Sequence, residues 1–229
     1  MLPTLETPKY SLTIPSTKKK VTFRPFLVKE EKVLLIALES GDTKQVMSAI
    51  KGVVEACTFE KVEADSLTTF DLEYVFMKLR SKSIGEKIDL IAKCQDCGND
   101  NEIQIDIESL SVNLPRKKVE TKIQLSDSIG VICKYPTVKD IENISNEDSM
   151  SVIISCIESI FDSETVYPIK DATPEEIDSF INSLGHQHLQ KISEFTNSIP
   201  KLTHESKFEC PKCGYLNTHK LEGLQSFFV

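Results

Sequence analysis

Polar and apolar residues alternate in the first part of the chain. Tyr10–Ile14 and Lys20–Arg24 both show this alternation, and the turn-like stretch Pro15–Lys19 separates them. Successive side chains of a β-strand point to opposite faces, so the pattern predicts a β-hairpin of two short strands.

The pattern then changes, and apolar residues recur every three or four positions. This spacing predicts helices over Lys29–Ser40 and Asp42–Cys57, with Gly41 ending the first helix and Asp42 capping the second. A third helix is expected over Thr69–Arg80, and its apolar residues lie on two sides. Such a helix packs between other elements, or it exposes one apolar side to a partner.

Alternation returns around two Cys-x-x-Cys motifs. Strands are expected at Ile88–Ala92 and Ile103–Ile107, on either side of the first motif. Strands are also expected at Lys207–Glu209 and Leu216–Leu221, on either side of the second motif. Each motif is therefore predicted to form the turn of a hairpin.

Between the two motifs lies a stretch with mostly helical patterns. Two strands come first, at Val119–Leu125 and Gly130–Lys134. Helices are then predicted to begin at Thr137 and to cover Asn146–Phe161, Thr173–Leu184 and His186–Ile199. The start at Thr173 is well marked, because a threonine N-cap, a proline at the first position and a glutamate three residues after the cap occur together.

Composition limits the function more than the fold. The 229 residues carry a formal net charge of −8. This charge disfavours nucleic-acid binding, which needs basic residues to displace counterions from phosphates, and it fits a protein that meets other proteins.

The longest apolar run, Val33–Leu38, has 6 residues, whereas a membrane-spanning helix needs ~20. No membrane segment is expected, and the N-terminus lacks the features of a signal peptide, so we expect a cytoplasmic protein.

Four of the seven cysteines form two Cys-x-x-Cys-Gly motifs, and these four are Cys94, Cys97, Cys210 and Cys213. In a reducing compartment, paired motifs of this kind indicate a metal site and not a disulfide frame. Glycine after the second cysteine permits the positive backbone angle with which the chain reverses, so that both sulfurs face one ion. We therefore predict one structural Zn²⁺ held by four thiolates.

The spacing of the motifs is unusual, because 112 residues separate Cys97 from Cys210. The predicted zinc ribbon is therefore split by an insertion. Zinc is preferred over iron because both motifs have the zinc-ribbon form, whereas affinity alone does not decide between metals. A four-cysteine site leaves no position for water, so it stabilises the fold and performs no catalysis. The alternatives are four free thiols or a redox dithiol, and paired motifs with ribbon flanks disfavour the second.

Other candidate chemistry is weaker. Cys57, Cys133 and Cys156 lie in apolar patterns and are expected in the core. On a helix, His186 and His188 face different ways and make a poor metal pair. The second motif is flanked by His204 and His219. These two are expected as surface groups, with supporting or replacement ligands as the alternative. No H-E-x-x-H, phosphate-binding loop or G-x-S-x-G is present. We therefore expect no enzyme and no small-molecule substrate.

These elements predict an α+β fold with an N-terminal β-hairpin, a helical layer, and a split four-cysteine zinc ribbon with a mostly helical insertion. Residues 1–86 are expected to form the hairpin and the helical region. Residues 87–135 and 200–229 are expected to form the split ribbon, and residues 136–199 the helical insertion.

Two parts of the chain resemble a known family. The opening, Tyr10–Pro15 followed by Val21–Lys32, resembles the baseplate hub proteins of T-even-like contractile-tailed bacteriophages. The later stretches Phe70–Tyr74 and Leu79–Gly85 are similar to the same family. The zinc prediction rests on the cysteine spacing and not on this resemblance.

The resemblance implies a non-enzymatic role in tail morphogenesis, as a component or an assembly factor of the central baseplate hub. The implied partners are other hub and tail proteins, and the implied location is the host cytoplasm during assembly or the virion tail baseplate. We expect Phe227–Val229 and the N-terminal hairpin to dock onto neighbouring subunits. The alternative is a zinc-ribbon nucleic-acid-binding or transcription accessory protein, which would need a basic, aromatic-bearing face on the ribbon.

Overall fold

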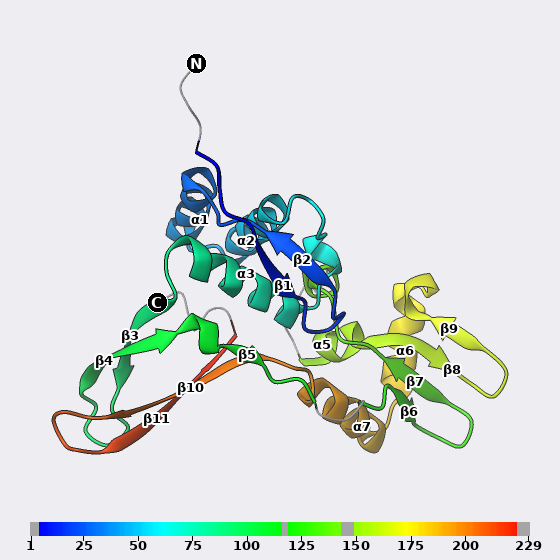
Figure 1. Ribbon diagram of the computed structural model, residues 1–229. Helices are drawn as coiled ribbons and strands as arrows, with labels where there is room; N and C mark the ends of the chain where they lie inside the picture. The colour runs from blue at the N-terminus through cyan, green and yellow to red at the C-terminus, as the bar shows by residue number, and fades with distance from the viewer. Residues whose placement is uncertain (1–4, 116–118, 143–148, 224–229) are drawn as a thin grey trace. The chain divides into compact units, whose positions relative to one another are not determined.

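The computed structural model describes residues 5–115, 119–142 and 149–223 (Figure 1). The chain divides into two compact units. The cysteine unit comprises residues 1–114 and 201–229, and the insertion unit comprises residues 115–200. Helices and several small antiparallel sheets confirm a mixed helix and sheet fold. The finer three-part division of the chain stays a prediction.

The cysteine unit opens with the predicted hairpin. Strands β1 (Tyr10–Thr13) and β2 (Lys20–Phe23) pair antiparallel, with Tyr10 opposite Phe23. Leu12 and Phe23 point into the core and are 8% and 3% exposed. The alternating sequence therefore produces the half-buried hairpin that it predicted. The predicted docking segment Phe227–Val229 lies outside the described residues.

A buried carboxylate fixes this hairpin to the helices. Asp71 is 1% exposed and accepts hydrogen bonds from the backbone amide of Ser16 (3.0 Å), from the hydroxyl of Ser16 and from the hydroxyl of Thr68 (2.7 Å). Thr68 is also the N-cap of helix α3 (Thr69–Ser83). The hairpin turn is thus held at the start of α3, and the buried charge has the partners that it needs.

Helices α1 (Val28–Ser40) and α2 (Thr43–Cys57) follow the hairpin as predicted. Gly41 ends α1 in the left-handed conformation, and the Asp42 carboxylate accepts a hydrogen bond from the Lys44 amide at 2.9 Å. Both predicted caps are therefore confirmed. A single 3₁₀ turn, η1 (Ala64–Ser66), leads from α2 toward α3.

Helix α3 is buried on more than one side, as its two apolar sides predicted. Its fully buried large side chains are Phe70, Leu72, Phe76, Met77 and Leu79. The helix packs against α2 and against β10 (Leu202–Glu209), the strand that leads to the second cysteine motif. It therefore forms the centre of the cysteine unit.

Two antiparallel hairpins carry the cysteine motifs in their turns (Figure 1). The first hairpin joins β3 (Lys87–Lys93) to β4 (Asp100–Asp106), and the second joins β10 (Leu202–Glu209) to β11 (Leu216–Glu222). Burial alternates strictly along β3 and β4. The strands predicted on either side of both motifs are therefore confirmed.

A short strand brings the two ends of the insertion together. After the 3₁₀ turn η2 (Ile107–Ser109), strand β5 (Ser111–Val112) pairs antiparallel with the start of β10. The amide of Asn113 then donates to the carbonyl of Lys201 at 3.2 Å. The chain therefore leaves the cysteine unit and re-enters it on neighbouring strands.

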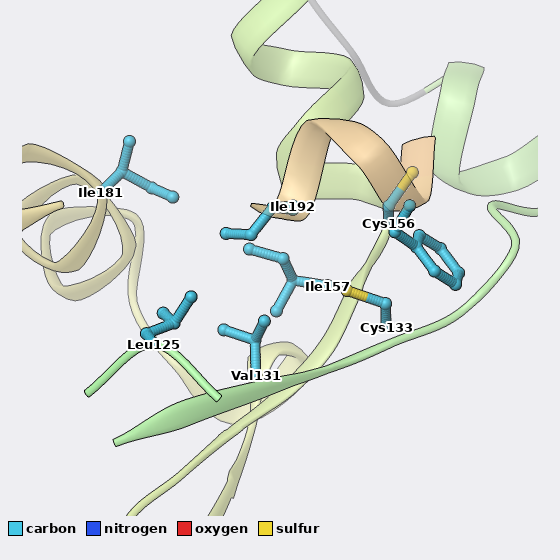
Figure 2. Packing of buried hydrophobic residues seen from close by; sticks show 8 residues of the cluster. Leu125, Val131, Cys133, Cys156, Ile157, Ile181 and Ile192 are labelled. Carbon is cyan, nitrogen blue, oxygen red and sulfur yellow. The ribbon is translucent and has the colours of Figure 1, made fainter. Parts of the chain in front are cut away.

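The insertion unit is built on one antiparallel sheet in the order β6-β7-β8-β9. Its strands are β6 (Lys122–Gln124), β7 (Gly130–Cys133), β8 (Ile157–Phe161) and β9 (Val166–Pro168). Its helices are α4 (Val138–Glu142), α5 (Ser149–Ser155), the 3₁₀ turn η3 (Ile169–Asp171), α6 (Pro174–Ser183) and α7 (His186–Asn197). Its core contains Val131, Cys133, Cys156, Ile157 and Ile192 (Figure 2).

The predicted helix over Asn146–Phe161 is wrong in its second half. Helix α5 ends at Ser155, and residues 157–161 form β8, which pairs with β7. Ile157, Ser159 and Phe161 are buried in alternation, whereas Glu158 is exposed. The apolar residues of this stretch fit a helical period as well as a strand period, and the sheet decides between them. The start at Thr173 is confirmed, since Thr173 and Glu176 form a reciprocal capping box.

An ion-pair network fixes η2 to α3, next to the strand that closes the insertion. The Glu108 carboxylate accepts a hydrogen bond from the Ser81 hydroxyl at 2.8 Å and pairs with Lys78 (3.0 Å) and Lys82 (3.1 Å). The Ser81 hydroxyl and then the two lysines outweigh burial and lower the pKa of Glu108 from 4.5 to about 2.

This shift predicts a pH-dependent contribution to stability. We expect Glu108→Gln to lower the free energy of unfolding at pH 7 by up to about 1 kcal/mol, the usual limit for partly exposed pairs. Because the folded pKa is lowered, the contribution is complete above pH 4.5 and disappears as the pH falls toward 2. Urea unfolding of both proteins between pH 7 and pH 2 measures the difference.

The control is Glu102→Gln, which removes an exposed carboxylate from β4. It should leave the pH dependence of the wild type unchanged. If the difference in unfolding free energy between wild type and Glu108→Gln stayed constant between pH 7 and pH 2, the assigned network would be contradicted.

Candidate metal centre

The turns of the two hairpins bring four sulfur atoms together. Sγ of Cys94 lies 3.6 Å from Sγ of Cys213, and Sγ of Cys97 lies 3.7 Å from Sγ of Cys210. All four sulfurs lie within 4.8 Å of one another. Sulfurs bound tetrahedrally at about 2.3 Å from a zinc ion lie about 3.8 Å apart, so the donor set has a suitable size for this metal.

The backbone makes the same turn in both motifs. In the first knuckle, residues 94–99, the amide of Cys94 donates to the carbonyl of Asn99 at 2.8 Å, and the amide of Gly98 donates to the carbonyl of Cys94 at 3.0 Å. In the second knuckle, residues 210–215, Cys210 and Gly214 make the equivalent bonds at 2.9 and 2.8 Å. These bonds turn the amides behind the sulfurs toward the interior of each turn.

The glycine of each knuckle has the positive backbone angle that the sequence indicated. The angle φ is 70° at Gly98 and 73° at Gly214. Residues with a Cβ atom rarely adopt this conformation, so a glycine after the second cysteine lets each turn close.

Asn217, which the sequence pattern did not single out, joins the two knuckles. Its side-chain oxygen accepts a hydrogen bond from the amide of Gln95 at 2.8 Å. Its side-chain nitrogen donates to Sγ of Cys94 at 3.5 Å and to the carbonyl of Tyr215 at 3.0 Å. Asn217 is 2% exposed, and one buried side chain thus connects residues from both hairpins.

Asn101 occupies the equivalent position in the first hairpin. It is 6% exposed, and its side-chain nitrogen donates to the carbonyls of Asn99 (2.8 Å) and Ala92 (3.2 Å). Both asparagines stand four residues after the second cysteine of their motif. The repeated pattern Cys-x-x-Cys-Gly-x-x-Asn was the signal that could have identified them.

The electrostatics of the cluster favour a cation. The backbone amide of Cys97 and then the side chain of Asn217 outweigh burial and lower the pKa of Cys94 to about 6. At Cys213 the amide of Tyr215 favours the thiolate, but removal from water and the neighbouring sulfurs raise the pKa to about 12. Four thiolates at this distance repel one another, and a bound divalent ion removes that repulsion and releases protons.

The four sulfurs differ in access to solvent. Cys94 and Cys210 are buried, Cys97 is half-buried and Cys213 is exposed. Four sulfur ligands complete a tetrahedral shell, so the centre can hold a metal but offers it no position for a reacting water. This arrangement can join two hairpins and does not by itself supply a catalytic group.

The histidines considered from the sequence do not join this cluster. Among the described residues, the four cysteines are the group of His, Cys, Asp and Glu side chains close enough to share a metal. His204 lies instead with its Nδ1 3.3 Å from the hydroxyl of Ser109. His186 and His188 lie on α7 of the insertion unit, where His188 accepts a hydrogen bond from the amide of Gly185.

The three remaining cysteines are core residues, as expected. Cys57 and Cys156 are 0% exposed and Cys133 is 2% exposed. Burial raises the pKa of Cys57 to about 11 and that of Cys133 to about 12. These thiols are therefore neutral and unreactive at physiological pH.

Comparisons with known proteins agree on one family. The family described as T4 bacteriophage base plate protein matches residues 7–229. The baseplate hub assembly protein gp26 of Enterobacteria phage T4 is 24% identical over 221 residues, which is 96% of this chain and 98% of that protein. No solved structure matches the chain. Every helix in the described ranges is too short or too polar to cross a membrane.

The role of Asn217 is testable. We expect Asn217→Ala to lower the free energy of unfolding by about 1–3 kcal/mol, because the Gln95 amide loses its acceptor and Cys94 loses a donor. Hydrogen exchange should show faster opening at both knuckles and not only at the second. The exposed Asn113 provides the control, and Asn113→Ala should have little effect. Opening confined to residues 210–217 would contradict a linking role.

Proposed function

The chain belongs to the T4 bacteriophage base plate protein family, and on that premise we propose that it is a non-enzymatic component or assembly factor of the central baseplate hub. It acts through contacts with other hub and tail proteins. It works in the host cytoplasm while the tail assembles, or in the tail baseplate of the virion. The name of the similar T4 protein, which describes hub assembly, supports this proposal.

The observation that carries the proposal is the exposed apolar surface of α1. This helix buries only Glu30, Leu34 and Ala37. Its exposed apolar residues are Val28, Val33, Leu35, Ile36 and Leu38. A helix that is apolar on all sides is normally enclosed, so a surface of this kind favours contact with another protein.

The exposed apolar surface of α1 borders a groove. It lies between α1 and α2, has a volume of about 600 Å³ and is bordered by Val33 and Ile36. Small residues, Ala37, Ala49 and Gly52, also line it. Apolar side chains of a partner helix fit a groove of this kind, which is a common mode of protein recognition.

The metal centre has a structural role in this proposal. One Zn²⁺ bound by Cys94, Cys97, Cys210 and Cys213 completes a split zinc ribbon and joins the two hairpins. The sulfur separations, the repeated knuckle turns and the lack of an open position support zinc as a stabilising ion.

The alternative of a nucleic-acid-binding ribbon receives little support from the charges near the knuckles. Lys93 pairs with Asp100 at 2.6 Å, and Lys220 pairs with Glu222 at 3.0 Å. These carboxylates offset the lysines that would otherwise attract phosphates. A protein partner is therefore the better-supported ligand class.

The contact surface can be tested with two isoleucines of equal exposure. Ile36 on α1 and Ile91 on β3 are each 66% exposed. We expect Ile36→Glu to reduce co-purification with the hub proteins of the same phage at least 10-fold, because it places a charge in an apolar contact. Ile91→Glu is the matched control and should retain binding. Thermal unfolding of both variants should match the wild type.

If both variants bound the hub proteins equally well, α1 would be excluded as the contact surface. Loss of binding by both would indicate that the contact is not confined to this helix. In either case the family membership would stand, and the proposed surface would not.

The zinc assignment has a separate test. We expect the purified protein to contain one zinc per chain by elemental analysis and native mass spectrometry. Cys97→Ser should lose the zinc and lower the melting temperature, because three remaining sulfurs leave the site incomplete. Cys133→Ser, which changes a buried thiol in the insertion unit, should keep the zinc. Protein without metal but with unchanged stability would contradict the assignment.

A further inference from the structure

We propose that hydrogen peroxide converts the metal centre into two disulfides that cross from one knuckle to the other, Cys94–Cys213 and Cys97–Cys210, with release of the metal. The oxidised centre keeps the two hairpins joined after the metal has left. The inference rests on the proposed function only in its starting state, a metal held by four thiolates.

The arrangement of the sulfurs brings both pairs within reach, because all four sulfurs lie within 4.8 Å of one another. The sulfur contacts of 3.6 and 3.7 Å both run between knuckles, from Cys94 to Cys213 and from Cys97 to Cys210. Each sulfur takes part in one of these two contacts, so both disulfides can form in the same molecule. A disulfide requires a separation of about 2.05 Å, so each pair has to approach by less than 2 Å once the central ion is gone.

The exposure of the sulfurs sets the point of attack. Cys213 is exposed, whereas Cys94 and Cys210 are buried and Cys97 is half-buried. Peroxide therefore reaches Cys213 first, and Sγ of Cys94 lies 3.6 Å from it across the knuckles. Cys97 is the more accessible member of the second pair.

The reaction balances without another cofactor. In the proposed starting state, where the metal holds Cys213 as a thiolate, the Cys213 sulfur attacks one peroxide oxygen, which breaks the O–O bond and yields a sulfenic acid and hydroxide. The Cys94 thiolate then attacks the Cys213 sulfur, forms the S–S bond and displaces the second hydroxide. Two protons convert the hydroxides to water. A second peroxide molecule oxidises Cys97 and Cys210 in the same way. Two molecules of peroxide therefore convert all four thiolate ligands into two disulfides.

Crossing disulfides replace the metal as the connection between the hairpins. Cys94 and Cys213 are 119 positions apart, and Cys97 and Cys210 are 113 positions apart. Bonds that close such long loops restrict the unfolded chain strongly. Disulfides within each Cys-x-x-Cys motif would close only a short turn and would leave the hairpins unconnected.

The sequence permits a complete map of the disulfides. Asp96 lies between Cys94 and Cys97, and Lys212 lies between Cys210 and Cys213. Cleavage before aspartate and after lysine therefore places each of the four cysteines in a different peptide. Mass spectrometry of the denatured, unreduced protein can then distinguish the crossing pairs from the pairs within each motif.

The experiment treats the purified protein with two equivalents of hydrogen peroxide and follows zinc with a coloured chelator. We expect release of one zinc per chain and the peptide pairs Cys94–Cys213 and Cys97–Cys210. The oxidised protein should resist proteolysis at least 10-fold longer than protein stripped of metal under reducing conditions. Cys133→Ser is the control and should give the same map and the same release, since Cys133 is buried in the insertion unit.

Disulfides within the motifs, disulfides between molecules, or sulfinic and sulfonic acids at Cys213 would overturn the proposal. Release of zinc without disulfide formation would overturn it as well. The zinc content before oxidation separates this result from the proposed function. Protein that contains no zinc but forms the crossing pairs would contradict the zinc assignment and would still support the pairing of the sulfurs.

Discussion

Two hairpins far apart in the chain have to end at one group of four sulfur atoms, and the rest of the cysteine unit is arranged around that constraint. At one end of the hairpins, β5 pairs with β10 and the Asn113 amide binds the Lys201 carbonyl. At the other end, the four sulfurs lie within 4.8 Å of one another, and Asn217 binds the opposite knuckle. The strand pairing reduces the entropy cost of bringing the four sulfurs together, because it already closes the long connection between the two hairpins.

The helices of the same unit divide into an enclosed one and an exposed one. Helix α3 buries large apolar side chains on more than one side and is fixed to the hairpin turn through Asp71. Helix α1 is as apolar in sequence, but it buries only a narrow stripe. Family membership confirms the resemblance seen in the sequence. Under the proposed function, the exposed apolar residues of α1 form the surface that contacts other baseplate proteins.

The four-cysteine cluster and the exposed apolar residues of α1 lie on different elements of this unit. The centre is made by turns of β-hairpins, whereas the exposed apolar surface is on α1. A metal-bound or disulfide-bonded centre would therefore maintain the fold without occupying the surface that we propose to meet a partner. Under the proposed function, a coordinatively closed site only has to preserve the connection between the hairpins.

The sequence by itself determined the features that depend on neighbouring residues. Gly41, Asp42 and Thr173 mark helix ends because caps are local hydrogen bonds, and the two Cys-x-x-Cys-Gly motifs identify their turns because glycine supplies the required angle. Only the tertiary structure decided which apolar residues of α1 stay exposed, that residues 157–161 form a strand, and that Asn217 reaches the other knuckle. Each of these depends on what lies opposite in space, and periodicity in one segment carries no information about the segment that packs against it.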